Sequence, residues 1–141
     1  MLNFCSLYSG SSGNSLFVET ENTKILIDAG MSCKKIEEAL QLIEVNPSSI
    51  DAILVTHEHS DHVKGISTIS RKFDIPVFST RETFGAMPAQ TEKLSDKNIK
   101  FLVDINVLEG VNIVKINNIK MKIKIALPDN LKDYTKYEVV Y

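Results

Sequence analysis

Short apolar runs separated by polar turns make up the first third of the chain. Residues 2–8, 15–19 and 24–28 are largely apolar, and polar residues fill the gaps between them. Runs of this length bounded by Gly, Ser, Asn and Thr are typical of strands. The polar turn at residues 21–24, between the second and third runs, predicts a hairpin.

A helical period replaces this pattern after Ser32. Apolar residues recur there at spacings of three and four, with charged residues on the other face; they are Ile36, Ala39, Leu40 and Ile43. This predicts an amphipathic helix that has Ser32 as its N-cap and ends at residues 46–49, where Pro47 stands.

The middle of the chain predicts further alternation of strands and helices. The expected strands are 50–56, 76–79, 99–103 and 111–116, and the expected helices are 62–72 and 81–87. Over 119–125 apolar residues alternate strictly with lysines, which predicts a half-buried strand. Strands and helices in this order indicate an α/β layered domain. The chain ends in an apolar, strand-like tail at 138–141, which predicts an unfinished fold because a strand needs a partner.

Composition and charge restrict the class of protein. The 141 residues are 43% hydrophobic and 24% charged, which suits one globular domain, and 16 basic against 18 acidic residues give a net charge of −2. This balance argues against a basic nucleic-acid coat protein. Two cysteines without a Cys-x-x-Cys pair exclude a disulfide scaffold and a thiolate zinc knuckle. With no visible signal peptide or membrane-length apolar run, we expect a cytoplasmic protein without membrane association.

All three histidines of the chain lie within six residues, after an apolar strand and before a helix. The segment is Thr56-His57-Glu58-His59-Ser60-Asp61-His62. Neutral imidazoles and a carboxylate suit Zn²⁺ or a similar divalent ion. His57 and His59 can face one metal across a tight turn, and Asp61 and His62 can face a second one. Two such cations can hold a bridging hydroxide and clamp the oxygens of a displaced group.

The same residues allow other interpretations of the histidine cluster. A solvated turn, or a helix N-terminus with Asp61 at its positive end, is compatible with the composition, but the strand–cluster–helix context favours a metal site. A zincin motif is excluded because position 61 is Asp rather than His. A serine triad lacks support because no Ser stands in a Gly-x-Ser-x-Gly elbow.

The pattern His57-x-His59-x-Asp61-His62 after an apolar strand resembles the HxHxDH signature of the metallo-β-lactamase-fold hydrolases. Two further segments, Ser9-Gly10-Ser11-Ser12-Gly13-Asn14-Ser15 and Ile27-Asp28-Ala29-Gly30, resemble the YycJ-like branch of that family, which is associated with exonuclease or phosphodiesterase activity. The resemblance is convincing from residue 2 to about 87 and looser to 125.

This resemblance implies an αββα sandwich with two divalent metal ions between its sheets, Zn²⁺ first and Mn²⁺ as the alternative. His57 and His59 would bind the first metal, and Asp61 and His62 the second, with Asp61 or the metal-bound water also handling protons during hydrolysis. Asp28 would support the metal-binding loop from behind, as would Thr56. The glycine–serine loop would contact the substrate through Ser11, Ser12, Gly13 and Asn14.

The chain departs from the family pattern after residue 62. The family supplies further His ligands from later segments, and this chain has none there. Asp129 is a conceivable carboxylate ligand, although a turn role is the commoner one. We therefore expect residues 1–141 to form a single, incomplete metallo-β-lactamase-like domain, truncated after its first half, with an open sheet face through which a homodimer can form.

Three functions follow as expectations. The first is a metal-dependent hydrolase acting through a metal-bound hydroxide, as a phosphodiesterase or DNA exonuclease with nucleic acid as substrate. The second is a thioester or lactam hydrolase on the same scaffold, since the metal motif does not distinguish these substrates. The third is a degenerate, non-catalytic remnant that binds metal weakly. The row Lys120, Lys122 and Lys124 fits either a phosphate-backbone contact or a charged outer strand face.

Overall fold

The computed structural model describes residues 1–102, 110–116, 119–126 and 136–140, and it describes side chains for residues 1–102. The chain divides into two compact units, Met1–Phe101 and Leu102–Tyr141. The single domain expected over residues 1–141 stays a prediction, and so does the homodimer. Within the described parts, no helix has the length and apolar character needed to cross a membrane.

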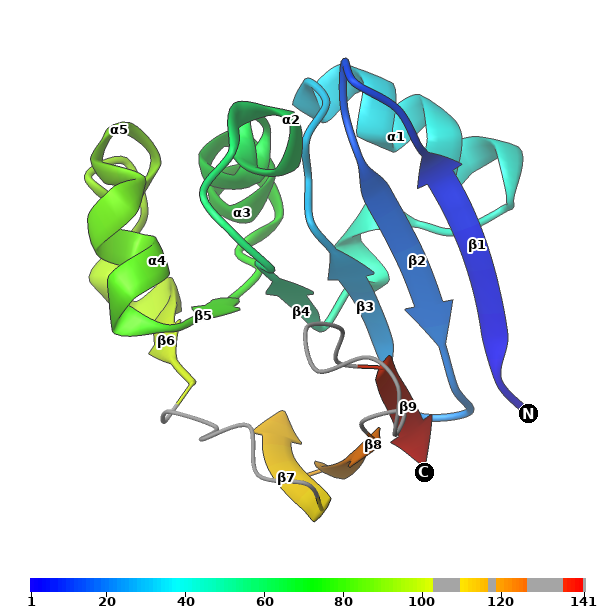
Figure 1. Cartoon of the computed structure of the whole chain (residues 1–141). Coiled ribbons are helices and arrows are strands. Elements are labelled where there is room, and N and C mark those ends of the chain that lie inside the picture. The colour runs from blue at the N-terminus through cyan, green and yellow to red at the C-terminus, as the bar shows by residue number, and fades with distance from the viewer. Residues whose placement is uncertain (103–109, 117–118, 127–135, 141) are drawn as a thin grey trace. The chain divides into compact units, whose positions relative to one another are not determined.

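A six-stranded mixed sheet forms the first unit. Its strands are β1 (Asn3–Tyr8), β2 (Ser15–Glu19), β3 (Lys24–Ile27), β4 (Ala52–Leu54), β5 (Val77–Ser79) and β6 (Ile99–Phe101). They lie side by side in chain order (Figure 1). The first three strands pair antiparallel, and β3 to β6 pair parallel. The predicted hairpin between β2 and β3 is confirmed, and so is the predicted α/β class.

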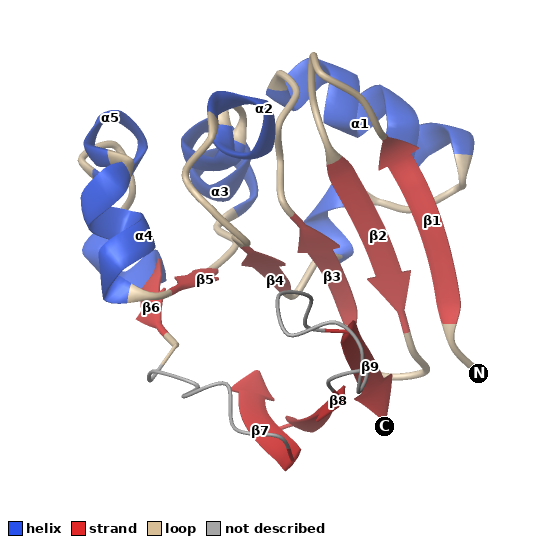
Figure 2. Ribbon diagram, viewed as in Figure 1, coloured by secondary structure: helices blue, strands red, loops and turns tan. Residues whose placement is uncertain are grey.

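Helices connect the parallel strands, as Figure 2 shows in blue. They are α1 (Cys33–Leu42), α2 (Ser60–Val63), α3 (Ile66–Phe73), α4 (Arg81–Ala86) and α5 (Pro88–Thr91), with 3₁₀ turns η1 (Pro47–Ser49) and η2 (Asp96–Asn98). The predicted N-cap is confirmed, because the Ser32 side chain accepts a hydrogen bond from the backbone N–H of Lys35.

Alternating residues of the central strands build the core between sheet and helices. Phe17, Leu26, Ile53 and Val77 follow one another in register across β2 to β5. They belong to one buried cluster with helix residues, which include Ile36, Leu40, Ile66 and Ile69. Because β3 and β4 are buried and paired at the centre of the sheet, their carboxyl ends are rigid attachment points for the loops that follow.

The helix expected over 62–72 is wrong in its bounds. Two helices, α2 and α3, cover this stretch, and the chain is not helical at Lys64 and Gly65 between them. The backbone N–H of Gly65 donates to the carbonyl of Ala29 at 2.7 Å, and a Cβ on Gly65 would overlap the carbonyl oxygen of Met31. This close approach of two backbones needs glycine and diverts the chain between the helices.

Other elements agree with the expected positions but are shorter or longer at their ends. The strand expected over 50–56 is only β4, and the helix expected over 81–87 is α4 followed by α5. The second unit has β7 (Gly110–Ile116), β8 (Ile119–Ala126) and β9 (Lys136–Val140), which pair antiparallel in that order. Asp129, the side chains of the lysine row and Tyr141 lie outside the described residues.

Candidate metal centre

The three segments that carry the family resemblance meet at the carboxyl ends of β3 and β4. Asp28 directly follows β3, His57 comes three residues after β4, and His62 lies on α2. Because β3 and β4 are neighbouring parallel strands, their carboxyl ends lie at the same edge of the sheet. The topology therefore brings Asp28 into one cluster with His57 and His62, although they lie 29 and 34 positions later in the sequence.

Asp28 is the hydrogen-bonding centre of this cluster. Its side chain is buried, and its backbone has a φ of 62°, the left-handed region that is uncommon for residues other than glycine. Its Oδ1 accepts from the backbone N–H of Thr56 at 2.8 Å, and its Oδ2 accepts from the Thr56 hydroxyl at 2.7 Å. Oδ2 also lies 2.7 Å from Nδ1 of His62. A buried carboxylate with three donors is a fixed anchor for the groups around it.

These contacts determine which ring nitrogens remain available. Because Asp28 Oδ2 is an acceptor, Nδ1 of His62 carries the proton and Nε2 keeps its lone pair in the neutral ring. The Thr56 hydroxyl gives its proton to Asp28, so it accepts from Nδ1 of His57 at 2.9 Å. Nε2 of His57 therefore keeps its lone pair as well. Both imidazoles are prepared to act as ligands through Nε2.

Asp61 and His59 complete the predicted ligand set. Oδ2 of Asp61 lies 3.4 Å from Nε2 of His62 and accepts a hydrogen bond from the Asn14 amide at 3.0 Å. The His57 ring lies 4.0 Å from the His62 ring and 4.7 Å from the His59 ring, measured between centroids. The four predicted ligands are thus close neighbours, and His59 is the exposed member of the group.

Backbone hydrogen bonds connect the three segments. The N–H of Asn14 donates to the carbonyl of Asp61 at 2.7 Å, and the N–H of Gly30 donates to the carbonyl of Asn14 at 2.9 Å. The N–H of Ala29 donates to the carbonyl of His62 at 2.9 Å. A Cβ on Gly30 would overlap the carbonyl oxygen of Asp61, so the approach of these backbones requires glycine at position 30.

Three side chains of the cluster are close enough together to surround a divalent cation. One ligand atom each from Asp28, His57 and His62 lies within 4.8 Å of the other two. Proximity alone would make Asp28 a ligand, but its oxygens already accept three hydrogen bonds from Thr56 and His62. We therefore assign Asp28 to positioning the imidazoles. Asp61 lies outside this group of three but has an oxygen 3.4 Å from Nε2 of His62, and imidazole nitrogens and carboxylate oxygens are donor types that suit a divalent transition ion.

The glycine–serine loop divides into two parts. Ser11 and Ser12 are exposed, and within the described residues their hydroxyls make no hydrogen bond. Gly13 is buried, whereas the Asn14 amide is engaged by Gly10, Asp61 and His62. Asn14 therefore holds the metal-motif residues, a role that the sequence analysis did not assign to it.

A buried serine beneath the site was also missed. The Ser15 hydroxyl is fully buried and donates to the backbone carbonyl of Asp28 at 2.9 Å, which helps to fix the left-handed backbone there. Its place directly after Asn14, at the start of a strand with otherwise apolar neighbours, is the only signal that the sequence carries for this role.

Similarity to known proteins agrees with this geometry. The chain is 48% identical over 86 residues to the exodeoxyribonuclease YycJ of Bacillus anthracis, covering 61% of this chain and 33% of that protein. It is also 48% identical over 81 residues to the exodeoxyribonuclease WalJ of Streptococcus pneumoniae, covering 57% of this chain and 30% of that protein. The chain therefore spans about a third of the length of these curated relatives.

Solved structures agree on the fold. The crystal structure of the metallo-beta-lactamase SMB-1 in a complex with mercaptoacetic acid matches with a TM-score of 0.58 at 16% identity, covering 81% of this chain and 47% of that chain. Such a match supports the fold alone, and the predicted metallo-β-lactamase-like fold is confirmed. The family model of the metallo-beta-lactamase superfamily matches residues 8–130. Because this match covers most of its residues, the chain belongs to the metallo-beta-lactamase superfamily.

Proposed function

We propose that this chain carries the histidine–aspartate part of a metal centre that hydrolyses phosphodiester bonds in DNA. One observation carries the proposal: hydrogen bonds from His62 to Asp28, and from His57 through Thr56 to Asp28, place the ring protons on Nδ1, so that Nε2 of both imidazoles keeps the lone pair that a metal needs. In the metal-free chain Nε2 of His62 lies 3.3 Å from the Asn14 amide nitrogen, and a metal would replace this contact. The similarity to two exodeoxyribonucleases supports DNA as the substrate.

The proposed ligands divide into two pairs. His57 and His59 would hold a first divalent ion, and Asp61 and His62 a second, with Zn²⁺ as the first choice and Mn²⁺ as the alternative. When bound, such ions supply Lewis-acid activation of water and stabilise charge on phosphate oxygens. The protein itself supplies fixed ring orientations through Asp28 and thereby lowers the reorganisation needed on binding.

Asp61 is the proposed catalytic residue. Its Oδ2 is held by Asn14 and lies beside His62, whereas its Oδ1 makes no hydrogen bond within the described residues. One carboxylate oxygen thus fixes the side chain, and the other is available to accept a proton from the attacking water or to bind a cation. The exposed hydroxyls of Ser11 and Ser12 would donate to phosphate oxygens of the substrate.

Metal binding and DNA cleavage test this function in two steps. Equilibrium dialysis against Zn²⁺ or Mn²⁺ is expected to load the wild-type chain, and Asp61→Ala is expected to bind less metal. End-labelled DNA is expected to be shortened by the wild type with metal, and EDTA or Asp61→Ala is expected to abolish turnover. Asp96→Ala removes an exposed carboxylate on η2 and serves as the matched control.

Two other functions remain as alternative outcomes. Cleavage of thioesters or lactams in preference to DNA would assign the second expected activity. A chain that binds no metal under these conditions would be a non-catalytic relative, in agreement with the lack of His after position 62. Full turnover by Asp61→Ala would contradict the proposed role of this carboxylate.

A further inference from the structure

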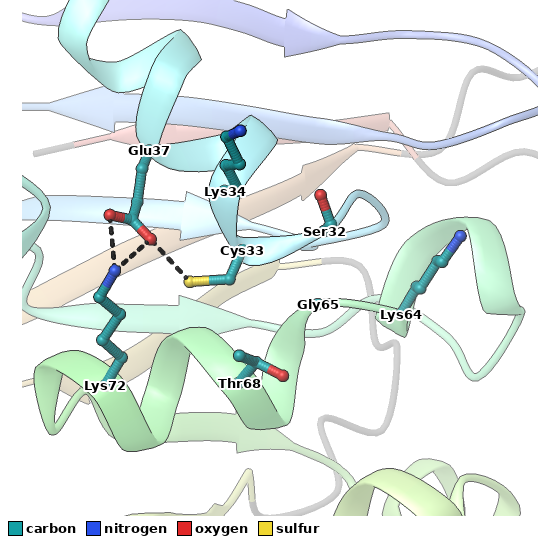
Figure 3. A pocket seen from close by; sticks show the side chains of 8 residues that line it. All are labelled: Ser32, Cys33, Lys34, Glu37, Lys64, Gly65, Thr68 and Lys72. Atoms are coloured by element: carbon teal, nitrogen blue, oxygen red, sulfur yellow. Dashed lines mark hydrogen bonds and ion pairs between the residues drawn. The ribbon is translucent and has the colours of Figure 1, made fainter.

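A cavity of about 430 Å³ lies between the start of α1 and helix α3, outside the histidine cluster. Figure 3 shows its lining: Lys72 and Glu37 meet at one end, Lys64 is at the other, and Ser32 and Thr68 lie between them. Lys34 also lines it. Three lysines against one glutamate make this lining positive in a chain whose net charge is −2.

The one carboxylate in the lining is already compensated. Glu37 accepts two hydrogen bonds from Nζ of Lys72, at 2.7 and 2.9 Å, and a third from the Cys33 thiol at 3.1 Å. Burial, followed by the hydrogen bond to Glu37, raises the pKa of Cys33 from its ordinary value of 9.0 to about 11. The thiol is therefore neutral at neutral pH and adds no negative charge.

The remaining cations have weak partners or none. Lys34 lies 3.9 Å from Glu38 in an exposed pair, which contributes little. Lys64 makes no ion pair or side-chain hydrogen bond with any residue whose side chain the structure describes. Free ammonium groups attract anions and repel cations, so the chemistry of this cavity favours an anionic ligand.

Hydroxyl groups in the lining add hydrogen-bond donors. The Ser32 oxygen accepts from the backbone N–H of Lys35, which leaves its own proton free. The Thr68 hydroxyl makes no hydrogen bond among residues 1–102. Ammonium and hydroxyl donors together are the groups with which proteins contact phosphate oxygens of nucleic acids.

One side of the cavity is adjacent in sequence to the candidate metal centre. Lys64 directly follows α2, which carries Asp61 and His62. The next residue, Gly65, donates its backbone N–H to the carbonyl of Ala29, the neighbour of Asp28. A DNA strand bound at the metal centre has phosphates at every nucleotide, so phosphates that are not being cleaved need contacts nearby.

We propose that the cavity lined by Lys34, Lys64, Ser32 and Thr68 binds a backbone phosphate of the DNA strand, separate from the phosphate that is cleaved. The proposal depends on the proposed function for its ligand, DNA. Free inorganic phosphate has the same chemistry and is the other source that the experiment must distinguish.

Binding of a fluorescent single-stranded oligonucleotide, measured by anisotropy in EDTA over a series of NaCl concentrations, tests the proposal. EDTA removes metal, so a failure of cleavage or of metal binding does not affect this measurement. Lys64→Ala is expected to weaken binding severalfold and to reduce the salt slope of the binding constant by about 0.7, the value for one phosphate contact on a single strand. Thr68→Val is expected to weaken binding with the slope unchanged.

Lys35→Ala is the matched control, because Lys35 is an exposed lysine on α1, next to Lys34, and does not line the cavity. It is expected to keep the wild-type slope, with thermal unfolding showing that all variants are folded. Equal slopes for Lys64→Ala and Lys35→Ala, or no oligonucleotide binding by the wild type, would overturn the proposal. If inorganic phosphate binds the wild type but not Lys64→Ala, and both bind the oligonucleotide equally well, the cavity is a site for free phosphate instead.

Discussion

The apolar layer of the first unit and the polar edge at the carboxyl ends of its strands are stabilised in different ways. Within β3, Leu26 is fully buried in the apolar layer, and two residues later Asp28 is buried among hydrogen bonds. The apolar layer depends on the volume and apolar character of many side chains, and each of them contributes part of its stability. The polar edge, which comprises Asp28, Gly30 and the histidine motif, depends on single atoms. The Asp28 carboxylate orients two imidazoles, and the absence of a Cβ at Gly30 allows its backbone to approach that of Asp61.

This difference teaches where a substitution acts. A change in the apolar layer lowers the free energy of unfolding but leaves the positions of the donor atoms defined by the remaining contacts. A change at the polar edge alters which atom donates and which accepts, and therefore alters binding more than folding. The following predictions test this separation.

Gly30→Ala is expected to have the largest effect, because Gly30 is buried at the point of the polar edge where two backbones meet. The new Cβ would overlap the carbonyl oxygen of Asp61, and backbone atoms cannot move aside as a flexible side chain can. We expect a loss of at least about 4 kcal/mol in the free energy of unfolding, together with loss of metal binding. Urea unfolding and equilibrium dialysis measure the two effects.

Gly85→Ala is the control for this substitution. Gly85 lies within α4, and a Cβ there meets nothing within 4 Å. Alanine in a helix is expected to raise the free energy of unfolding by roughly 0.5–1 kcal/mol. Similar destabilisation by the two variants would show that glycine-to-alanine changes act through the unfolded chain and not through the contact with Asp61.

Leu26→Ala is expected to affect folding without comparable loss of binding. Leu26 has no exposed surface and lies between Phe17 and Ile53 in the sheet register. Removal of its side chain leaves a cavity, so the free energy of unfolding is expected to fall by about 3 kcal/mol. Metal affinity of the folded fraction, measured at low temperature, should stay within about threefold of wild type; a larger loss would contradict the separation of the two regions.

The sequence pattern predicted the apolar layer well, because its signal is repeated in many residues. The spacing of Ile36 and Leu40 predicted α1 and its Ser32 cap, although α1 ends at Leu42 and not at the expected residues 46–49. The apolar runs predicted β1 to β5 to within two residues at their ends. The break between α2 and α3 was missed because Gly65 is one residue among several helix-compatible neighbours. The break results from a backbone hydrogen bond between Gly65 and Ala29, and such a distant contact leaves no signal in the local sequence pattern.

The polar edge was predictable in its membership but not in its connections. The histidine motif identified His57, His59, Asp61 and His62, and the resemblance suggested Asp28 and Thr56, which the structure places together. The hydrogen bonds of Asn14 and Ser15 are contacts across 47 and 13 positions of sequence. No single-residue propensity encodes such a pairing. The ligand roles themselves stay predictions.

Asp28→Asn tests the polar edge directly. Asparagine keeps the shape of the side chain but replaces one oxygen with an NH₂ group, which donates and cannot accept, so at least one of the three donors from Thr56 and His62 loses its acceptor. The hydrogen bonds that orient Thr56 and His62 are then incomplete, and Zn²⁺ affinity is expected to fall by about 10- to 100-fold. Competition with a chromophoric chelator measures the affinity. Asp96→Asn, an exposed change on η2, is expected to leave it unaltered; an equal loss in both variants would exclude a positioning role for Asp28.

Cys33 gives the smallest expected effect and lies where the apolar layer meets the lysine-lined cavity. Burial raises the pKa of its thiol from 9.0 to about 11, so above pH 9 the unfolded chain loses this proton before the folded chain does. Stability from this group is therefore complete below about pH 9 and is lost as the pH rises toward 11. At pH 10 the wild type is expected to have lost about 1 kcal/mol relative to its value at pH 8 through this group alone. Cys33→Ala has no thiol to titrate, so the difference between the two pH profiles of urea unfolding isolates the effect. Parallel profiles would show that the thiol titrates alike in the folded and unfolded chain, and would contradict the effect of burial on Cys33.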